Sequence, residues 1–280
     1  MGLVKNLWRG FAGGADHSRQ QTLRFILEDI QVQVRLPYSN IETEESARVV
    51  NYPFHQKNWF DNNAKQRNQH CFVHLHTECW YYMASIFRFA DGELGNMFCR
   101  LWLKKVPEGI NALDRQQLAQ HVINEHHEHY NAPVQPDIPY NHCKGLNTEI
   151  RQRVQAEAEL AASRGSPHRL ENLEEYTAIA IESQGYSALA PASIISLHGQ
   201  DWVYYQDKQF LDSPNGADFY CLPLDDQHYF AISFRYTVYQ SEKKRWLKHA
   251  KATQQMVLDS LKVSQIDNTA DNLLVHTDDT

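Results

Sequence analysis

The sequence predicts an α+β protein in which antiparallel sheets are backed by helices, and three observations support this class. Apolar and polar residues alternate in several segments, as they do in half-buried strands. The Asp91-Gly92 dipeptide lies between two such segments and favours a tight turn, which predicts an antiparallel meander. Apolar residues at helical spacing follow the capping residues Asp114 and Ser241.

The clearest strand covers residues 30–36, where apolar residues alternate with Gln31, Gln33 and Arg35 up to Pro37. Residues 41–68 are polar and irregular, and they predict a loop region with a short helix near residues 44–50. Strand patterns then return in three successive segments. These are residues 70–82, 83–89 and 97–103.

Two helices are expected in the middle of the chain. Asp114 and Gln117 resemble a capping box, which predicts a helix that ends near Tyr130. Three prolines in residues 131–143 favour a linker. A second helix is predicted over residues 148–163, and its thin apolar stripe is typical of a solvated connector.

The remaining chain predicts five strands and a long C-terminal helix. The strands are expected at residues 176–181, 193–198, 202–206, 219–222 and 229–239. The helix begins at Ser241, and its apolar face is formed by Trp246, Ala250, Thr253, Val257 and Leu261. The polar, acidic tail beyond Ser264 is expected to be disordered.

The pattern L-H-x-x-x-W-x-Y occurs at residues 75–82 and again at residues 197–204. A similar order of strands and a capped helix follows each copy, which predicts two related, duplicated units. The predicted organisation has five parts. They are an N-terminal amphipathic segment (1–21), a first α+β unit (22–131), a linker with a helix (132–174), a second α+β unit (175–263) and a disordered acidic tail (264–280).

Composition excludes several classes of protein. Apolar residues make up 42% of the 280 residues and the net charge is −7, which is typical of a globular chain and disfavours nucleic acid as a partner. The five cysteines form no CxxC pair, and no run approaches the ~18 apolar residues of a membrane span. Because a secretory signal is also absent, a cytoplasmic location is expected.

The N-terminus offers a possible contact with a membrane surface. Leu3, Leu7, Trp8 and Phe11 lie at helical spacing, and Lys5 and Arg9 flank them. The alternative is a tail that packs on its own domain.

Histidines form the one candidate metal site. His74 and His76 alternate along a predicted strand, and His121 and Glu125 share one face of a predicted helix; this donor set suits zinc. No zincin motif is present, and packed or solvated histidines are the alternative interpretation. No other cofactor is indicated.

Other catalytic signatures are absent: the sequence has no nucleophile elbow, phosphate loop or dinucleotide fingerprint, and no catalytic residue is assigned. A turn accounts for Asp225-Asp226. The candidate binding residues are instead large aromatics, which concentrate at protein interfaces. They are Trp59, Tyr82, Trp102, Tyr204 and Tyr205. An acidic, aromatic face suits a basic protein partner, although core packing accounts for many aromatics.

Three segments resemble the PsbP-like fold family, and some bacterial effector-immunity proteins have a similar C-terminal half. They are Leu36-Pro37, the aromatic strand at residues 229–236 and the helix end at residues 256–261. The resemblance implies a scaffold rather than an enzyme. We therefore expect a non-catalytic cytoplasmic protein-binding scaffold, such as an immunity or adaptor protein. The alternative is a metal-dependent hydrolase that uses the His/Glu cluster.

Overall fold

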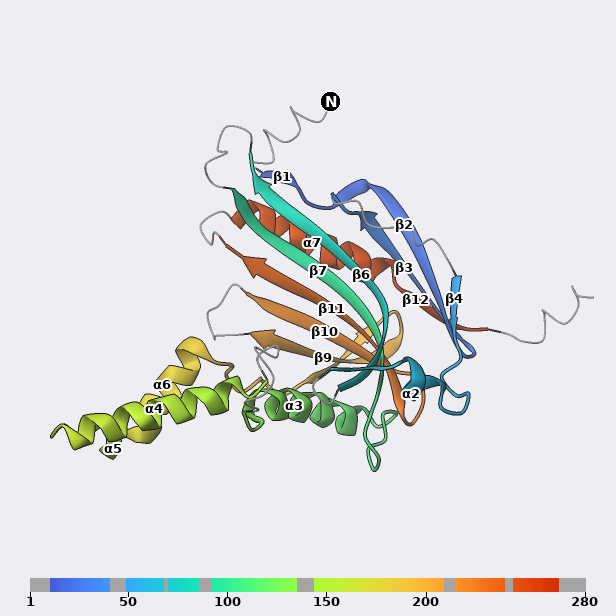
Figure 1. Ribbon diagram of the computed structural model, residues 1–280. Coiled ribbons are helices and arrows are strands. Elements are labelled where there is room, and N and C mark those ends of the chain that lie inside the picture. Colours follow the sequence, from blue (N-terminus) through green and yellow to red (C-terminus); the bar gives the residue numbers. More distant parts are fainter. Residues whose placement is uncertain are drawn as a thin grey trace, which may run out of the picture.

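The computed structural model describes residues 11–40, 49–67, 70–85, 92–134, 144–208, 215–239 and 244–266. It confirms the α+β class. One large antiparallel sheet has a long helix, α7 (Lys244–Ser260), and a small sheet on its inner face (Figure 1). Helix α3 (Arg115–Asn131) packs on the outer face.

The large sheet combines strands from both of the predicted units. Its strands are β1 (Phe11–Gly13), β5 (Lys65–Arg67), β6 (His70–Ala84), β7 (Glu93–Lys105), β8 (Ser193–Leu197), β9 (Gln200–Lys208), β10 (Gly216–Pro223) and β11 (His228–Val238). Their order is β1-β6-β7-β11-β10-β9-β8, and β5 pairs with β6. Because β7 pairs with β11 along eleven residue positions, the two halves of the chain form one sheet rather than two.

The small sheet combines three strands from the first part of the chain with the last described strand. Its order is β12 (Lys262–Gln265), β3 (Ile30–Tyr38), β2 (Asp16–Leu27) and β4 (Val49–Tyr52). Strand β3 confirms the clearest sequence prediction. Strand β2 begins within the segment predicted to be amphipathic, because its polar first half hides the strand pattern, and β12 extends into the segment expected to be disordered.

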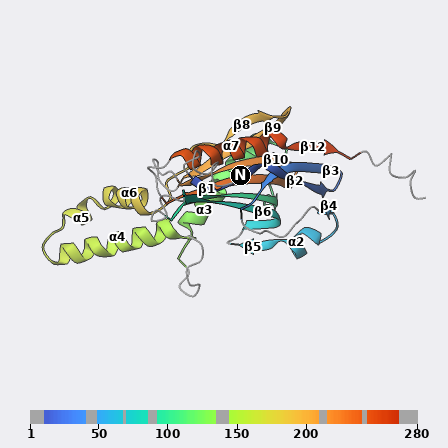
Figure 2. The same ribbon diagram turned by 90° about the horizontal axis from the view of Figure 1, so that it is seen from above.

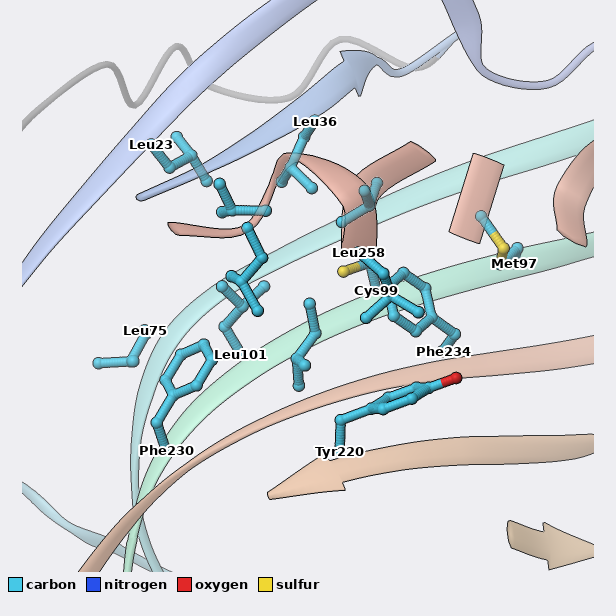
Figure 3. Packing of buried hydrophobic residues seen from close by; sticks show 14 of the residues in the cluster. Leu23, Leu36, Leu75, Met97, Cys99, Leu101, Tyr220, Phe230, Phe234 and Leu258 are labelled. Carbon is cyan, nitrogen blue, oxygen red and sulfur yellow. The ribbon is translucent and has the colours of Figure 1, made fainter. Parts of the chain in front are cut away.

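The inner face of the large sheet carries the main core. Strand residues alternate between the faces, so that Leu101, Phe230 and Phe234 point toward Leu36 of the small sheet and Leu258 of α7 (Figure 3). The predicted apolar face of α7 is confirmed, since all five of its residues are buried. Burial of this continuous apolar surface is what holds the two sheets together.

Gly95 of β7 allows α7 to approach the large sheet closely. A Cβ atom at this position would lie 2.4 Å from Trp246 Cη2 and 2.4 Å from the Thr237 carbonyl oxygen. Both distances are far below van der Waals contact, so the residue at position 95 cannot carry a side chain without displacing the helix.

Helix α3 and its cap agree with the sequence prediction. The Asp114 side chain accepts hydrogen bonds from the backbone N–H groups of Gln116 and Gln117. Leu118 and Val122 are buried against Val203 and Tyr229 of the large sheet. This contact forms a second, smaller core on the outer face.

Three helices form an arm that projects from the body of the molecule (Figures 1 and 2). They are α4 (Leu146–Ser163), α5 (His168–Glu171) and α6 (Leu173–Gln184). Helix α4 was predicted, whereas the strand expected at residues 176–181 is wrong, because its β-branched residues lie within α6. A short apolar run is compatible with either a strand or a helix, and here the packing of α6 against α4 favours the helix.

The two L-H-x-x-x-W-x-Y segments have different local structures. The first lies within β6, whereas the second crosses a hairpin in which His198 and Gly199 connect β8 to β9 with positive φ angles. Trp80 and Trp202 are nevertheless buried in the same core. The duplication predicted from this pattern is not shown.

Several predictions lie partly or wholly outside the described residues. Residues 1–10, most of 44–50, 86–89 and 135–143 belong to this group, and so does the tail from residue 267. Residues 49–52 form β4 instead of the end of a helix. Within the described part, no helix is both long enough and apolar enough to cross a membrane.

Candidate functional site

Three of the four predicted metal ligands, His76 on one side and His121 with Glu125 on the other, lie on opposite faces of the large sheet. His76 Nε2 is 3.6 Å from Glu78 Oε2, and buried Glu78 accepts a hydrogen bond from Gln21 of the small sheet on the inner face. His121 and Glu125 lie on α3, on the outer face. The predicted group of His74, His76, His121 and Glu125 is therefore not assembled, and the hydrolase built on it loses its site.

An irregularity in β6 explains this error. The pairing of β6 with β7 shifts register between His74 and His76. Residues before and after such a shift no longer follow one alternation, so His74 is exposed and its Nε2 lies 2.8 Å from Thr77 Oγ1. Strict alternation along the sequence cannot reveal this shift.

The five candidate binding aromatics do not form one exposed face. Tyr82 is fully buried in the inner core, and Trp59 and Tyr204 pack against the same core. Tyr205 is buried in the outer core, where Trp102 also packs. Because neighbouring strand residues alternate between faces, these side chains contribute to packing on both sides of the sheet.

The proposed membrane contact includes one described residue. Phe11 is buried in β1, where it pairs with Ala84, and its ring contacts Tyr82 at a centroid distance of 5.5 Å. Phe11 therefore packs on its own domain instead of contacting a membrane. Leu3, Leu7 and Trp8 lie outside the described residues.

The described cysteine side chains are buried thiols. Burial raises the pKa of Cys79 to about 11 and that of Cys221 to about 12, and it raises the pKa of Cys99 well above its usual value. All three are therefore protonated at neutral pH and are poor nucleophiles.

A cluster of His55, Asp225 and His228 joins two distant segments. Among the described residues, it is the one group of three or more His, Cys, Asp or Glu side chains whose ligand atoms all lie within 4.8 Å of one another. His55 Nε2 is 2.7 Å from Asp225 Oδ2, and His228 Nδ1 is 3.0 Å from the same oxygen. Two imidazoles thus converge on a single carboxylate oxygen.

The turn between β10 and β11 fixes the carboxylate. Asp225 Oδ1 accepts hydrogen bonds from the backbone N–H groups of Gln227, at 2.7 Å, and His228, at 2.6 Å. Burial raises the pKa of Asp225, but hydrogen bonds from His228, His55 and Gln227 outweigh burial, and the net pKa lies well below its usual value. Asp225 is therefore ionised at neutral pH.

Aromatic rings and a second carboxylate surround the cluster. The His228 ring packs against Phe54 and Phe60, with centroid distances of 4.6 and 5.3 Å. Glu28, in the β2–β3 turn, accepts a hydrogen bond from the His55 backbone N–H at 2.5 Å. Its Oε1 lies 4.0 Å from His55 Nδ1, the ring nitrogen that points away from Asp225.

An open pocket of about 920 Å³ lies beside this turn. Its wall is formed by α3, the connection between β7 and α3, Asp226 and Gln227 of the β10–β11 turn, and Asp61 of α2 (Trp59–Asn63). Two of the predicted ligands, His121 and Glu125, lie in this wall, whereas His74 and His76 do not. We call it the acidic pocket, because its lining contains five carboxylates and one lysine. These residues are Asp61, Glu108, Glu125, Glu128, Asp226 and Lys105.

The carboxylates of the acidic pocket differ in their partners. Glu125 Oε2 forms an ion pair with Lys104 Nζ at 2.7 Å, and Asp61 lies 3.8 Å from Lys105 Nζ. Glu108, Glu128 and Asp226 are exposed, and none of them forms an ion pair with a residue that the structure describes. The pocket therefore keeps a surplus of negative charge.

Comparison with protein-family models finds no match, and comparison with curated proteins finds none either. The PsbP-like and immunity-protein resemblances therefore stay predictions. The sequence predicts the turn at Asp225-Asp226 but not the cluster. The Asp225-x-x-His228 spacing is a weak local signal, and His55 is 170 residues away from Asp225.

Proposed function

We propose that the protein is a non-catalytic binding protein that holds a basic segment of a protein partner in the acidic pocket. The observation that carries this proposal is the concave surface with three exposed carboxylates, Glu108, Glu128 and Asp226, that lack cationic partners among the described residues. An immunity or adaptor role is one concrete form of such a function.

Charge and size both favour a lysine- or arginine-containing segment. A concave surface that carries one sign of charge concentrates the field, so it attracts a cationic partner and increases the association rate. The volume of about 920 Å³ is large enough for several side chains rather than one. The two lysines near the pocket are already engaged with Glu125 and Asp61, which leaves the other carboxylates available to a ligand.

The test measures binding of a fluorescein-labelled hexalysine peptide to the full chain by fluorescence anisotropy at low salt. A double charge reversal, Glu108→Lys with Glu128→Lys, should weaken binding about tenfold, because each change removes an attraction and adds a repulsion. Binding should also weaken as salt is raised, since mobile ions screen exposed charges.

The matched control reverses two exposed glutamates on the arm, Glu174→Lys with Glu182→Lys, and so changes the net charge equally. This control should bind hexalysine within about twofold of the unmodified chain, apart from a small long-range effect. Equal losses in the two double variants would mean that net charge, and not the pocket, attracts the peptide, and the proposal would fail. Absence of hexalysine binding at low salt would also overturn it.

A further inference from the structure

The cluster of His55, Asp225 and His228 is independent of the acidic pocket in its chemistry. It offers two imidazole nitrogens and one carboxylate oxygen, which is a donor set for first-row divalent metal ions. We propose that this cluster binds one divalent metal ion of the zinc class. The site has three protein ligands, and its fourth position is open to water.

The distances fit this assignment with small movements. Bonds of about 2.0 to 2.2 Å in a tetrahedral site place neighbouring ligand atoms ~3.4 Å apart. In the structure, Asp225 Oδ2 lies 2.7 Å from His55 Nε2 and 3.0 Å from His228 Nδ1. Each histidine nitrogen therefore needs to move away from Asp225 Oδ2 by less than about 1 Å, and the two histidine nitrogens lie within 4.8 Å of each other.

The surroundings hold two ligands in place and leave the third adjustable. Asp225 is fixed by two backbone N–H groups, and His228 is held between Phe54 and Phe60 with 7% of its side chain exposed. The His55 side chain is 55% exposed and lies on the solvent side of the site. An ion and its water ligand can enter from this side.

Glu28 is placed to accept a hydrogen bond from the second ring nitrogen of His55, and metal-binding histidines usually have such a partner. When a metal binds one ring nitrogen, the proton is on the other nitrogen, and a carboxylate or carbonyl commonly accepts it. Glu28 Oε1 lies 4.0 Å from His55 Nδ1 and already holds the backbone of this residue. A small rotation of the His55 ring brings its Nδ1–H within hydrogen-bond distance of Glu28.

The His228 ring presents one of its two nitrogens to the cluster. Its Nδ1 faces Asp225 Oδ2, whereas its Nε2 is buried and has no hydrogen-bond partner among the described residues. A metal ion that binds His228 in this cluster therefore uses Nδ1, and the ring proton is then on Nε2.

The experiment uses the full chain without a histidine tag, freed of metal with EDTA and then dialysed. Co²⁺ is added first, because tetrahedral Co²⁺ gives visible absorption bands, and Zn²⁺ binding is then measured by calorimetry. We expect one ion per chain at this site. Three variants are compared with the unmodified chain by the same two measurements, with circular dichroism as the check of folding.

His55→Asn and Asp225→Asn each remove one ligand. His55 is exposed, so its loss is compatible with folding, and the Asn oxygen at position 225 can still accept the backbone N–H groups of the turn. Each should weaken Zn²⁺ binding by ~10- to 100-fold or more, because even the loss of a hydrogen-bond partner of a metal ligand weakens metal binding by this range. The control is His168→Asn, which replaces an exposed histidine on the arm. This variant should bind Zn²⁺ as tightly as the unmodified chain does.

Two results would overturn the proposal. One is failure of the unmodified chain to bind one equivalent of Zn²⁺ or Co²⁺. The other is binding that His55→Asn and Asp225→Asn leave unchanged, which would assign the ion to other histidines among the fifteen in the chain. None of these variants replaces a residue that lines the acidic pocket, so hexalysine binding can be measured on the same samples as a separate test.

Discussion

The two faces of the large sheet differ in how they are covered. The inner face is packed by α7 and the small sheet, and 33 buried residues of the described chain belong to its core. The outer face has 10 such residues, mostly beneath α3, and the acidic pocket opens beside them. We infer that the inner face determines stability, whereas the outer face and its edge leave polar groups available for binding.

The largest expected effect is on the inner face. Trp246→Ala should lower the free energy of unfolding by about 3–5 kcal/mol, because it removes a buried indole and leaves a cavity between α7 and β7. Urea denaturation followed by circular dichroism measures this loss. A loss below about 1 kcal/mol, as for a surface change, would contradict the inference that the inner face determines stability.

A smaller loss is expected on the outer face. Leu118→Ala also truncates a fully buried side chain, but α3 has fewer neighbours there and can move into the space. We expect about 2–3 kcal/mol, the lower part of the range for Leu→Ala changes in cores. The same denaturation experiment gives the value, and a loss larger than that of Trp246→Ala would reverse the ranking of the two faces.

The outer face should also respond to pH through His126. Burial, together with the neighbouring His127 and His129, lowers the pKa of His126 from 6.5 to about 4, although Asp207 opposes the shift. The unfolded chain therefore binds more protons between these values, so this part of the stability is present above pH 6.5 and is lost as the pH falls toward 4. We expect a loss of about 1–2 kcal/mol between pH 7 and pH 5.

His126→Gln is the matched variant for this effect. Unfolding in urea at pH 7 and pH 5 should show a smaller pH dependence for the variant than for the unmodified chain. An identical dependence in both proteins would show that His126 does not titrate as its burial implies.

The smallest effect is expected on the arm, which belongs to neither core. Ile179 of α6 is 54% exposed, so Ile179→Ser should change the free energy of unfolding by less than about 0.5 kcal/mol. Thermal denaturation suffices as the measurement. A loss of several kcal/mol would mean that the exposed side of α6 is covered by another surface in solution.

Local periodicity predicted much of the fold but little of its assembly. The strand at residues 30–36, the Asp114 cap and the buried face of α7 each depend on neighbouring residues, and all three are confirmed. The β7–β11 pairing depends on residues far apart in the sequence, as does the small sheet around β2. No local pattern specifies them.

The candidate sites were less predictable than the fold for the same reason. The register shift in β6 separates His74 from the alternation that predicted a shared face with His76. The acidic pocket combines α2, α3 and the β10–β11 turn, and the histidine cluster combines the same turn and the first residue of β11 with the connection after β4. In both sites, tertiary folding places charged residues together that have no common sequence motif.

The most direct test of the binding role is to locate a bound cation-rich ligand on the protein. A hexalysine peptide with a photoactivatable crosslinker is bound to the full chain at low salt, irradiated and mapped by mass spectrometry. We expect crosslinks within residues 105–129 and at residues 226–227, and we expect them to be lost in the Glu108→Lys, Glu128→Lys variant. Crosslinks concentrated on α4–α6, or unchanged in that variant, would contradict it.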